Sequence, residues 1–461
     1  MPVRLIESLA TTQALAGLFS DESILQAMLD FEVALVRAEA RLNIVPGTAV
    51  NVIEAAARAS AFDGAVIAQD SLRAGTPVIP LVKALTGRVR ANDPAAAGFV
   101  HWGATSQDVS DTALVLLLKR AQPILEADFT RLEEALRRLS EQHQRTVMLG
   151  RTLLQPAPPI TFGLKAAGWL GAIRRSRARL NSSFAEALVV QFGGASGTVA
   201  ALGERGVEVG RALADELGLC YPDAPWHTHR DRLAAVVTAC GVQTGCLGKM
   251  ARDISLLMQG EVGEAAEPGG EGRGGSSTMP HKHNPAGCSV TLAAAHRVPG
   301  LVAVILSSMV QEHERGAGGW QAEWPTVAAI IQATGVAASL MAEVAEGLAV
   351  DTARMRANID ATRGVIFAER AMMLLGQQLG RDVAHKILEE ATRQSAAQGR
   401  RLVEVLAEMP EVTGHIDGAT LRRLEEPEEY LGSAGAFRSR LLSSPEQNRP
   451  EGGKGQRPCR S

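Results

Sequence analysis

The sequence of 461 residues predicts an all-α protein in which long helices pack as an extended bundle. Long stretches repeat apolar residues at steps of three and four, which is the period of an α-helix. Alternating apolar and polar residues, typical of half-buried strands, are scarce, and no series of strands alternates with helices. Several helical stretches, such as residues 328–338, are rich in small residues that let helices approach closely.

The first long helix is predicted near the N-terminus, because apolar residues recur at Ile24, Met28, Phe31, Leu35, Ala38 and Leu42. Ser20 and Asp21 can cap its start, and residues 43–47 end it. A second helix is predicted over about residues 108–144. It should kink at Pro123, because proline lacks an N–H group and crowds the preceding turn.

Four further long helices are predicted over about residues 162–188, 232–259, 285–311 and 325–348. Some of their faces are more apolar than a monomer needs, which suggests burial between subunits. Boundaries are expected near residues 107 and 350. They divide the chain into an N-terminal helical domain, a central helix-bundle domain, a C-terminal helical domain and a disordered tail, over residues 1–107, 108–350, 351–445 and 446–461.

Composition argues against several classes of partner. The net charge is −3 and no long basic block occurs, so neither nucleic acid nor an anionic membrane surface is expected. The N-terminus lacks a signal-peptide core, and no stretch holds 18 uninterrupted apolar residues, so no membrane span is expected. Five cysteines without a C-x-x-C pair fit a reducing cytoplasm, and Cys288 is expected to pack in the core. His227 and His229 suggest a metal, but no carboxylate or cysteine stands at ligand spacing, so none is expected.

The glycine-rich stretch that ends in GGSSTMPHKHNP, residues 274–285, is the strongest functional signal. Glycine reaches positive φ easily, so this stretch suits a loop that closes over a ligand. Asn284 can cap a helix whose first residue is Pro285. The positive end of that helix would favour an anion beside Ser276, Ser277 and Lys282. A flexible surface linker is the alternative, but linkers rarely combine Met-Pro-His-Lys with a clean helix start.

Two other stretches, residues 99–112 and 150–163, also gather polar residues. Thr105 and Ser106 lie where the second helix should begin, and His101 lies just before it. In the other stretch, Gln155 precedes three nearby prolines. Each has a purely structural explanation: capping for the hydroxyls, a backbone hydrogen bond for Gln155 and packing for His101. Together, the three stretches suggest patches that converge on one polyanionic ligand.

These three stretches resemble the signature regions of the fumarase/aspartase superfamily. GGSSTMPHKHNP is similar to the S-S-x-M-P-x-K-x-N signature, HWGATSQDVSDT to the T-S-x-D region, and GRTLLQPAPP to the G-R-T-x-x-Q region. Their order and spacing agree over about residues 1–445. The resemblance implies three helical domains, with a long central helix bundle shared in a homotetramer. Each active site would take its three segments from three subunits.

Four other stretches resemble the carboxymuconate cycloisomerases of this superfamily: PWHTHRDR, EPGGEGRGGSSTMPHK, QEHERGAGGWQAEW and PEEYLGSAGAF. The implied substrate is a small polycarboxylate of the protocatechuate degradation route. One of its carboxylates would attack an alkene carbon and close a lactone, while a proton is delivered beside another carboxylate. This scheme requires neither a metal nor an organic cofactor.

The resemblance also implies roles for individual residues. Ser276 would be the proton-transfer serine, with its pKa lowered by Lys282 and by the N–H groups of the loop. His101 would orient the substrate or relay a proton. An enolate-like dianion needs donors and positive charge in a dry site. The implied substrate-binding residues are Thr105, Ser106, Gln155, Ser277, Asn284, Arg315 and Trp320.

Two positions depart from the superfamily pattern. Leu153 stands where adenylosuccinate and argininosuccinate lyases carry an acid–base histidine, which leaves the second acid or base unidentified. His283 stands where relatives often carry arginine. The alternatives are a fumarate-releasing lyase such as adenylosuccinate lyase, a cycloisomerase for the sulfo analogue of the muconate, and a non-catalytic helical scaffold. Leu153 argues against the first, and the intact Ser276, Lys282 and Asn284 argue against the last.

Overall fold

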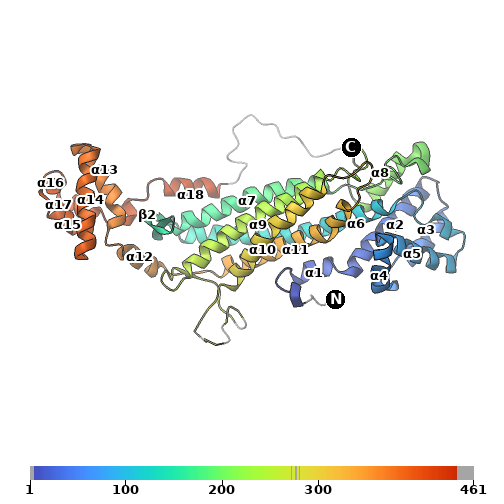
Figure 1. Ribbon diagram of the computed structural model, residues 1–461, viewed down its shortest axis with the longest axis horizontal. Helices are drawn as coiled ribbons and strands as arrows, with labels where there is room; N and C mark the ends of the chain where they lie inside the picture. The colour runs from blue at the N-terminus through green and yellow to red at the C-terminus, as the bar shows by residue number, and fades with distance from the viewer. Residues whose placement is uncertain (1–4, 271–272, 276–277, 280, 444–461) are drawn as a thin grey trace. The chain divides into compact units, whose positions relative to one another are not determined.

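The structure is a computed structural model that describes residues 5–270, 273–275, 278–279 and 281–443 (Figure 1). The chain forms two compact units, each assembled from three separated segments. The first unit consists of Met1–Thr130, Arg175–Lys249 and Ser289–Met341. The second consists of Arg131–Arg174, Met250–Cys288 and Ala342–Ser461. The tail predicted to be disordered, residues 446–461, lies outside the described residues.

The prediction of an all-α fold is confirmed, because helices dominate the described residues. Six long helices match the predicted ones: α2 (Asp21–Arg41), α6 (Ser106–Gln142), α7 (Phe162–Ala187), α9 (Asp231–Leu257), α10 (Ala286–Ser308) and α11 (Gly319–Glu346). Ser20 caps α2 as predicted, since its hydroxyl accepts a hydrogen bond from Ser23 N at 3.3 Å. The prediction for α11 began too late, because Pro325 lies inside this helix.

In the first unit, helix α2 forms much of the core. The shorter helices are α1 (Gln13–Leu18), α3 (Gly47–Ala56), α4 (Gly64–Ala74), α5 (Val78–Asn92) and α8 (Gly206–Leu217). Helix α2 packs against α3 and α8. Two glutamates, Glu32 and Glu39, share its buried face, because each follows a buried residue, Met28 or Leu35, by four positions. Two carboxyl groups thus lie where the helix pattern calls for apolar side chains.

The second unit contains a β-hairpin that the sequence did not predict. Strands β1 (Val147–Thr152) and β2 (Gln155–Thr161) pair antiparallel, with Thr152 opposite Gln155. The two turn residues, Leu153 and Leu154, both have positive φ, 49° and 66°, as a two-residue turn of type I′ requires. Gly150 is needed in β1, because a Cβ there would overlap the carbonyl oxygen of Pro158.

Helices make up the C-terminal part of the second unit. They are α12 (Thr352–Asp360), α13 (Ala368–Leu379), α14 (Arg381–Gln398), α15 (Leu402–Ala407), α16 (Pro410–Thr413), α17 (Gly418–Arg423) and α18 (Ala434–Leu442). Helix α13 packs against α14, and Leu375, Leu388 and Leu406 belong to their shared apolar core. Two short strands, β3 (Ala265–Ala266) and β4 (Ala349–Val350), also pair antiparallel.

Helices α9, α10 and α11 are unusually apolar. By length and composition alone, each could cross a membrane. The sequence criterion of 18 uninterrupted apolar residues missed them because it allows no polar interruption. Helices α9 and α11 bury 61% and 67% of their most apolar window inside the protein, so core packing accounts for them. Helix α10 buries only 22% of its window and leaves Val304 and Leu306 exposed.

Candidate active site

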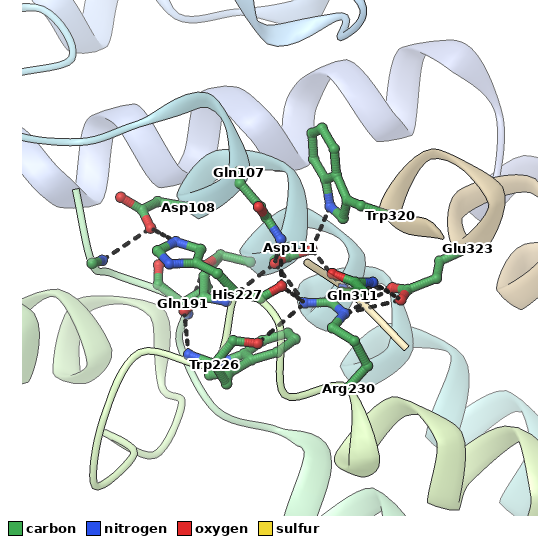
Figure 2. Close-up of polar contacts among 12 residues, drawn as sticks. Gln107, Asp108, Asp111, Gln191, Trp226, His227, Arg230, Gln311, Trp320 and Glu323 are labelled. Atoms are coloured by element: carbon green, nitrogen blue, oxygen red, sulfur yellow. Dashed lines mark hydrogen bonds and ion pairs between the residues drawn. The ribbon is translucent and has the colours of Figure 1, made fainter. Parts of the chain in front are cut away.

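The first turn of α6 is held by one buried carboxylate (Figure 2). Asp108 accepts hydrogen bonds from the backbone N–H groups of Thr105, Gly193 and Gly194 at 2.9–3.0 Å. Its Oδ1 also lies 2.7 Å from Nε2 of His227. Because Asp108 is fully buried, it fixes the start of α6 against the backbone at residues 193–194.

Thr105 and Ser106 lie at the N-terminal end of α6, as the sequence predicts. The helix begins at Ser106, and the carbonyl of Thr105 accepts the first helical hydrogen bonds, from Asp108 and Val109. Within the described part of the chain, neither hydroxyl has a hydrogen-bond partner, and both side chains are half-buried. They can therefore bind an anion at the positive end of the helix.

A buried arginine with two carboxylates lies beside this helix start; we call Asp111, Arg230 and Glu323 the Arg230 cluster (Figure 2). Arg230 donates two hydrogen bonds to Asp111 at 2.8 and 2.9 Å, and others to Glu323 at 2.6–3.0 Å. Its guanidinium also lies 4.7 Å from the ring centroid of Trp226. Burial opposes the charge of Arg230, but the two carboxylates outweigh it, so the pKa of Arg230 is raised. The cluster joins α6, the segment before α9, and α11.

The side chains of Arg315 and Trp320 form hydrogen bonds with other residues of the first unit. Nη1 of Arg315 donates to Gln107 Oε1 at 3.0 Å, and Nη2 donates to the carbonyl oxygens of Gly194 and Ala195. Burial lowers the pKa of Arg315, against the opposing charges of Asp108 and Asp111. Trp320 Nε1 donates to Asp111 Oδ1 at 3.0 Å. Both side chains thus support the backbone around the helix start, and substrate contact by either stays a prediction.

His101 makes one strong polar contact in the first unit. Its Nδ1 lies 2.7 Å from Oε1 of Glu32 on α2, whose side chain is almost fully buried. Burial favours the neutral ring, but the charge and hydrogen bond of Glu32 and the charge of Asp108 outweigh it, so the pKa of His101 is raised. His101 is therefore protonated more readily than an ordinary histidine.

Glu39 is the second buried glutamate of α2 and has no hydrogen-bond partner on either oxygen among the described residues. Burial, with a smaller contribution from the charge of Glu32, raises the pKa of Glu39 from 4.5 to about 8. The folded state thus keeps a proton that the unfolded chain loses. The contribution of this raised pKa to the free energy of unfolding is complete below about pH 4.5, and it is lost as the pH rises towards about 8.

Glu39→Gln is therefore expected to stabilise the protein increasingly as the pH rises from about 5 to about 8, by an amount on the order of a few kcal/mol. Thermal unfolding measured across this pH range tests it. Glu22→Gln, at an exposed position of the same helix, is the control and should keep the wild-type pH dependence. Equal pH dependence in Glu39→Gln and wild type would contradict the raised pKa.

In the second unit, Gln155 lies at the start of β2 and lines a cavity of about 570 Å³. Arg151, in the same lining, is held by Glu264 at 2.6 and 2.9 Å, and Asn358 donates to Glu264 at 2.7 Å. Gln155 is exposed and has no such partner within the described ranges. Its amide is therefore available to a ligand.

The start of α10 differs from the prediction. The helix begins at Ala286, one residue after Pro285, and the carboxylate of Glu267 accepts hydrogen bonds from Gly287 N at 3.0 Å and Cys288 N at 2.8 Å. The side chain of Asn284 donates to the carbonyl of Gly275 instead of capping the helix. The prediction that Asn284 is the N-cap is wrong, and two N–H groups expected to be free for an anion are already bonded.

The remaining predicted residues are placed as follows. Lys282 is exposed at the end of the glycine-rich stretch, and Ser276 and Ser277 lie outside the described residues. Cys288 is fully buried, and burial raises the pKa of its thiol, as expected for a packing residue. Among the described residues, no group of three His, Cys, Asp or Glu side chains could hold a metal ion.

The predicted site residues divide between the two units. The first unit contains His101, Thr105, Ser106, Arg315 and Trp320, and the second contains Gln155, Lys282 and Asn284. Sequence reasoning missed Glu32, the Asp108–His227 pair and the Arg230 cluster. A signal for Glu32 existed, since a glutamate stood on the apolar face of a predicted helix.

Comparison with known proteins shows which family this chain resembles. A model described as lyase matches residues 8–300, and one described as the C-terminus of adenylosuccinate lyase matches residues 364–441. The 3-carboxy-cis,cis-muconate cycloisomerase of Bradyrhizobium diazoefficiens is 47% identical over 96% of this chain and 98% of that protein. The nitrosuccinate lyase of Streptomyces davaonensis is 43% identical over 94% of this chain and 92% of that protein.

A solved structure agrees with these relatives. The crystal structure of the 3-carboxy-cis,cis-muconate lactonizing enzyme from Pseudomonas putida superposes with a TM-score of 0.90 at 46% identity. The match covers 95% of this chain and 98% of that one. The resemblance seen in the three signature stretches is thus confirmed, and the chain belongs to the fumarase/aspartase superfamily of lyases.

Proposed function

We propose that this protein is an isomerase that converts 3-carboxy-cis,cis-muconate to 4-carboxymuconolactone. The observation that carries this proposal is near-full-length similarity, at 46–47% identity, to a cycloisomerase and a lactonizing enzyme for that compound. Among the described residues, the hydroxyls of Thr105 and Ser106 at the positive end of α6 have no partner, and they provide an anion-binding surface that suits a substrate with three carboxylates.

The reaction is an intramolecular addition. An oxygen of one carboxylate forms a bond to an alkene carbon, and the π electrons move to the neighbouring carbon, beside a second carboxylate. An acid then delivers a proton to that carbon, so product and substrate are isomers. The intermediate resembles an enolate dianion, which fixed hydrogen-bond donors and positive charge stabilise. The side chains of Thr105, Ser106 and Lys282 can supply these donors and charge.

For the proton, we propose Ser276, with Lys282 and the N–H groups of the loop lowering the pKa of its hydroxyl. Ser277, Asn284 and Gln155 would hold carboxylates. The amide of Gln155 supports this role, because it is exposed and has no partner in the part of the chain that the structure describes. All of the chemistry in this scheme is acid–base and electrostatic, so it needs no cofactor.

The proposed assembly is a cytoplasmic homotetramer whose sites combine segments of several copies. Helix α10 supports this arrangement. It is apolar enough for a membrane span, yet it buries only 22% of its most apolar window within one chain. An apolar helix left uncovered in this way is stabilised when other subunits cover it.

A second candidate comes from the nitrosuccinate lyase of Streptomyces davaonensis, which is 43% identical to this chain. Elimination from nitrosuccinate would release nitrite and leave fumarate. Both reactions use a proton-transfer group beside a carboxylate, so the described geometry suits either.

An ultraviolet assay separates the candidates. Purified protein with 3-carboxy-cis,cis-muconate should remove the absorbance of the conjugated diene, and NMR should identify the lactone. Parallel assays contain nitrosuccinate, adenylosuccinate or the sulfo analogue of the muconate. Nitrite or fumarate release without diene loss would overturn the proposed function, and faster turnover of the sulfo analogue would correct its substrate.

A further inference from the structure

His101 has a strained backbone that brings its ring to a buried carboxylate. Its φ is 59°, in the left-handed region that non-glycine residues rarely adopt. Such a conformation is unfavourable and persists only where other contacts hold it. The short Nδ1 contact to Glu32 Oε1 is a contact of that kind.

The buried carboxylate of Glu32 is not expected to stabilise the fold. It exposes only 2% of its surface on the apolar face of α2, and its Oε2 has no partner among the described residues. Burying a carboxylate with a single hydrogen bond destabilises a fold relative to an apolar side chain of similar size. The contact to His101 is therefore the feature of Glu32 that needs a functional explanation.

The contact also selects the tautomer of His101. A carboxylate oxygen accepts, so Nδ1 must carry the hydrogen, and Nε2 becomes the nitrogen that can give or take a proton. Within the described part of the chain, Nε2 has no partner, and 19% of the side chain is exposed. His101 precedes Thr105 and Ser106 by only a few residues, so its ring lies in the same region of the first unit as their hydroxyls.

We propose that Glu32 is a positioning residue that fixes His101 as the second proton-transfer group of the reaction. After the acid has given its proton to the substrate carbon, Nε2–H of the protonated His101 ring returns a proton to that acid, and the neutral ring then takes up a new proton from water. This inference rests on the proposed function, and it concerns the second acid or base that the sequence left unidentified because Leu153 cannot transfer a proton. The charged groups that act on His101 are Glu32 from α2 and Asp108 from α6. Together they make the ring a readily protonated acid, and the contact with Glu32 leaves Nε2 as the nitrogen that can transfer a proton.

Glu32→Gln tests the proposal with steady-state kinetics. Glutamine keeps the shape of the side chain but removes its charge, so kcat should fall about tenfold to hundredfold with KM nearly unchanged. The limb of the pH profile governed by His101 should move to lower pH, because the cation loses a neighbouring anion. Adding His101→Asn to Glu32→Gln should cost little more than His101→Asn alone, since both changes act through one group.

Glu39→Gln is the matched control, because Glu39 is also a buried glutamate of α2 but has no contact to His101. Its kcat and pH profile should stay close to wild type. A folded Glu32→Gln variant with wild-type kcat would overturn the proposal. So would a lower activity with an unshifted pH profile, which would indicate a structural role.

A measurement without substrate keeps this test independent of the proposed function. Diethylpyrocarbonate acylates neutral imidazole. Peptide mapping by mass spectrometry, after the whole protein has been modified, can follow His101 as the pH changes. The midpoint should lie above that of an ordinary histidine in wild type and fall in Glu32→Gln. Equal midpoints, or no modification of His101 at any pH, would overturn the inference. Absence of lactonisation with a shifted midpoint would reject only the proposed function.

Discussion

Arg230→Met is expected to lower the stability of the protein by about 3–5 kcal/mol, enough to reduce the yield of folded protein sharply. Arg230 exposes 1% of its surface and is the cation between the buried carboxylates of Asp111 and Glu323. Without it, the two buried carboxylates lose the cation that forms hydrogen bonds with both of them. Soluble yield and thermal unfolding measure the effect.

Two variants show whether the loss comes from buried charge. Arg37→Met removes an ion pair with Glu54 in which both side chains are more than 40% exposed, and it should cost less than about 1 kcal/mol. Adding Asp111→Asn and Glu323→Gln to Arg230→Met removes the stranded charges and should restore part of the stability. If Arg230→Met unfolds at the wild-type temperature, the Arg230 cluster does not hold α6 and α11 together.

Ser276→Ala is expected to lower kcat about 10²–10⁴-fold, the usual contribution of a positioned proton-transfer group. The prediction rests on the signature GGSSTMPHKHNP, because Ser276 lies outside the described residues. KM should change little, since the hydroxyl acts mainly in the transition state. The diene assay with 3-carboxy-cis,cis-muconate measures both parameters.

Ser182→Ala, at an exposed serine of α7, is the matched control and should retain wild-type kinetics. Circular dichroism and thermal unfolding should show that both variants are folded. Near-normal turnover by a folded Ser276→Ala variant would assign proton delivery to another group. His101 would then be the next residue to test.

The helices could be predicted from the sequence because their signals are local. In α2, the apolar residues recur within a turn of one another and the cap at Ser20 directly precedes the helix. The structure shows both features. The β1–β2 hairpin could not be predicted, since Pro156, Pro158 and Pro159 are residues that strands normally avoid. Its turn also uses leucine where Asn-Gly is the usual signal.

The positions of the candidate site residues were predictable only where a single segment of the sequence was sufficient. Thr105 and Ser106 were identified because capping residues precede a helix directly. His101 and Glu32 are 69 positions apart, and Asp111 and Arg230 are 119 apart, so no local pattern links them. Asn284 was wrongly predicted as the cap for the same reason. Glu267 lies outside that segment, and its carboxylate accepts the hydrogen bond from an N–H group at the start of α10.

The turn of the β1–β2 hairpin is made of a residue pair that weakens it. Leucine at positive φ costs on the order of 1 kcal/mol per residue, whereas Asn-Gly would form the same turn with little strain. Leu153 is 97% exposed and Leu154 77% exposed, so neither gains compensating burial within this chain. The hairpin tip is therefore both strained and apolar, and covering it with another surface would bury the two leucines and offset part of the strain.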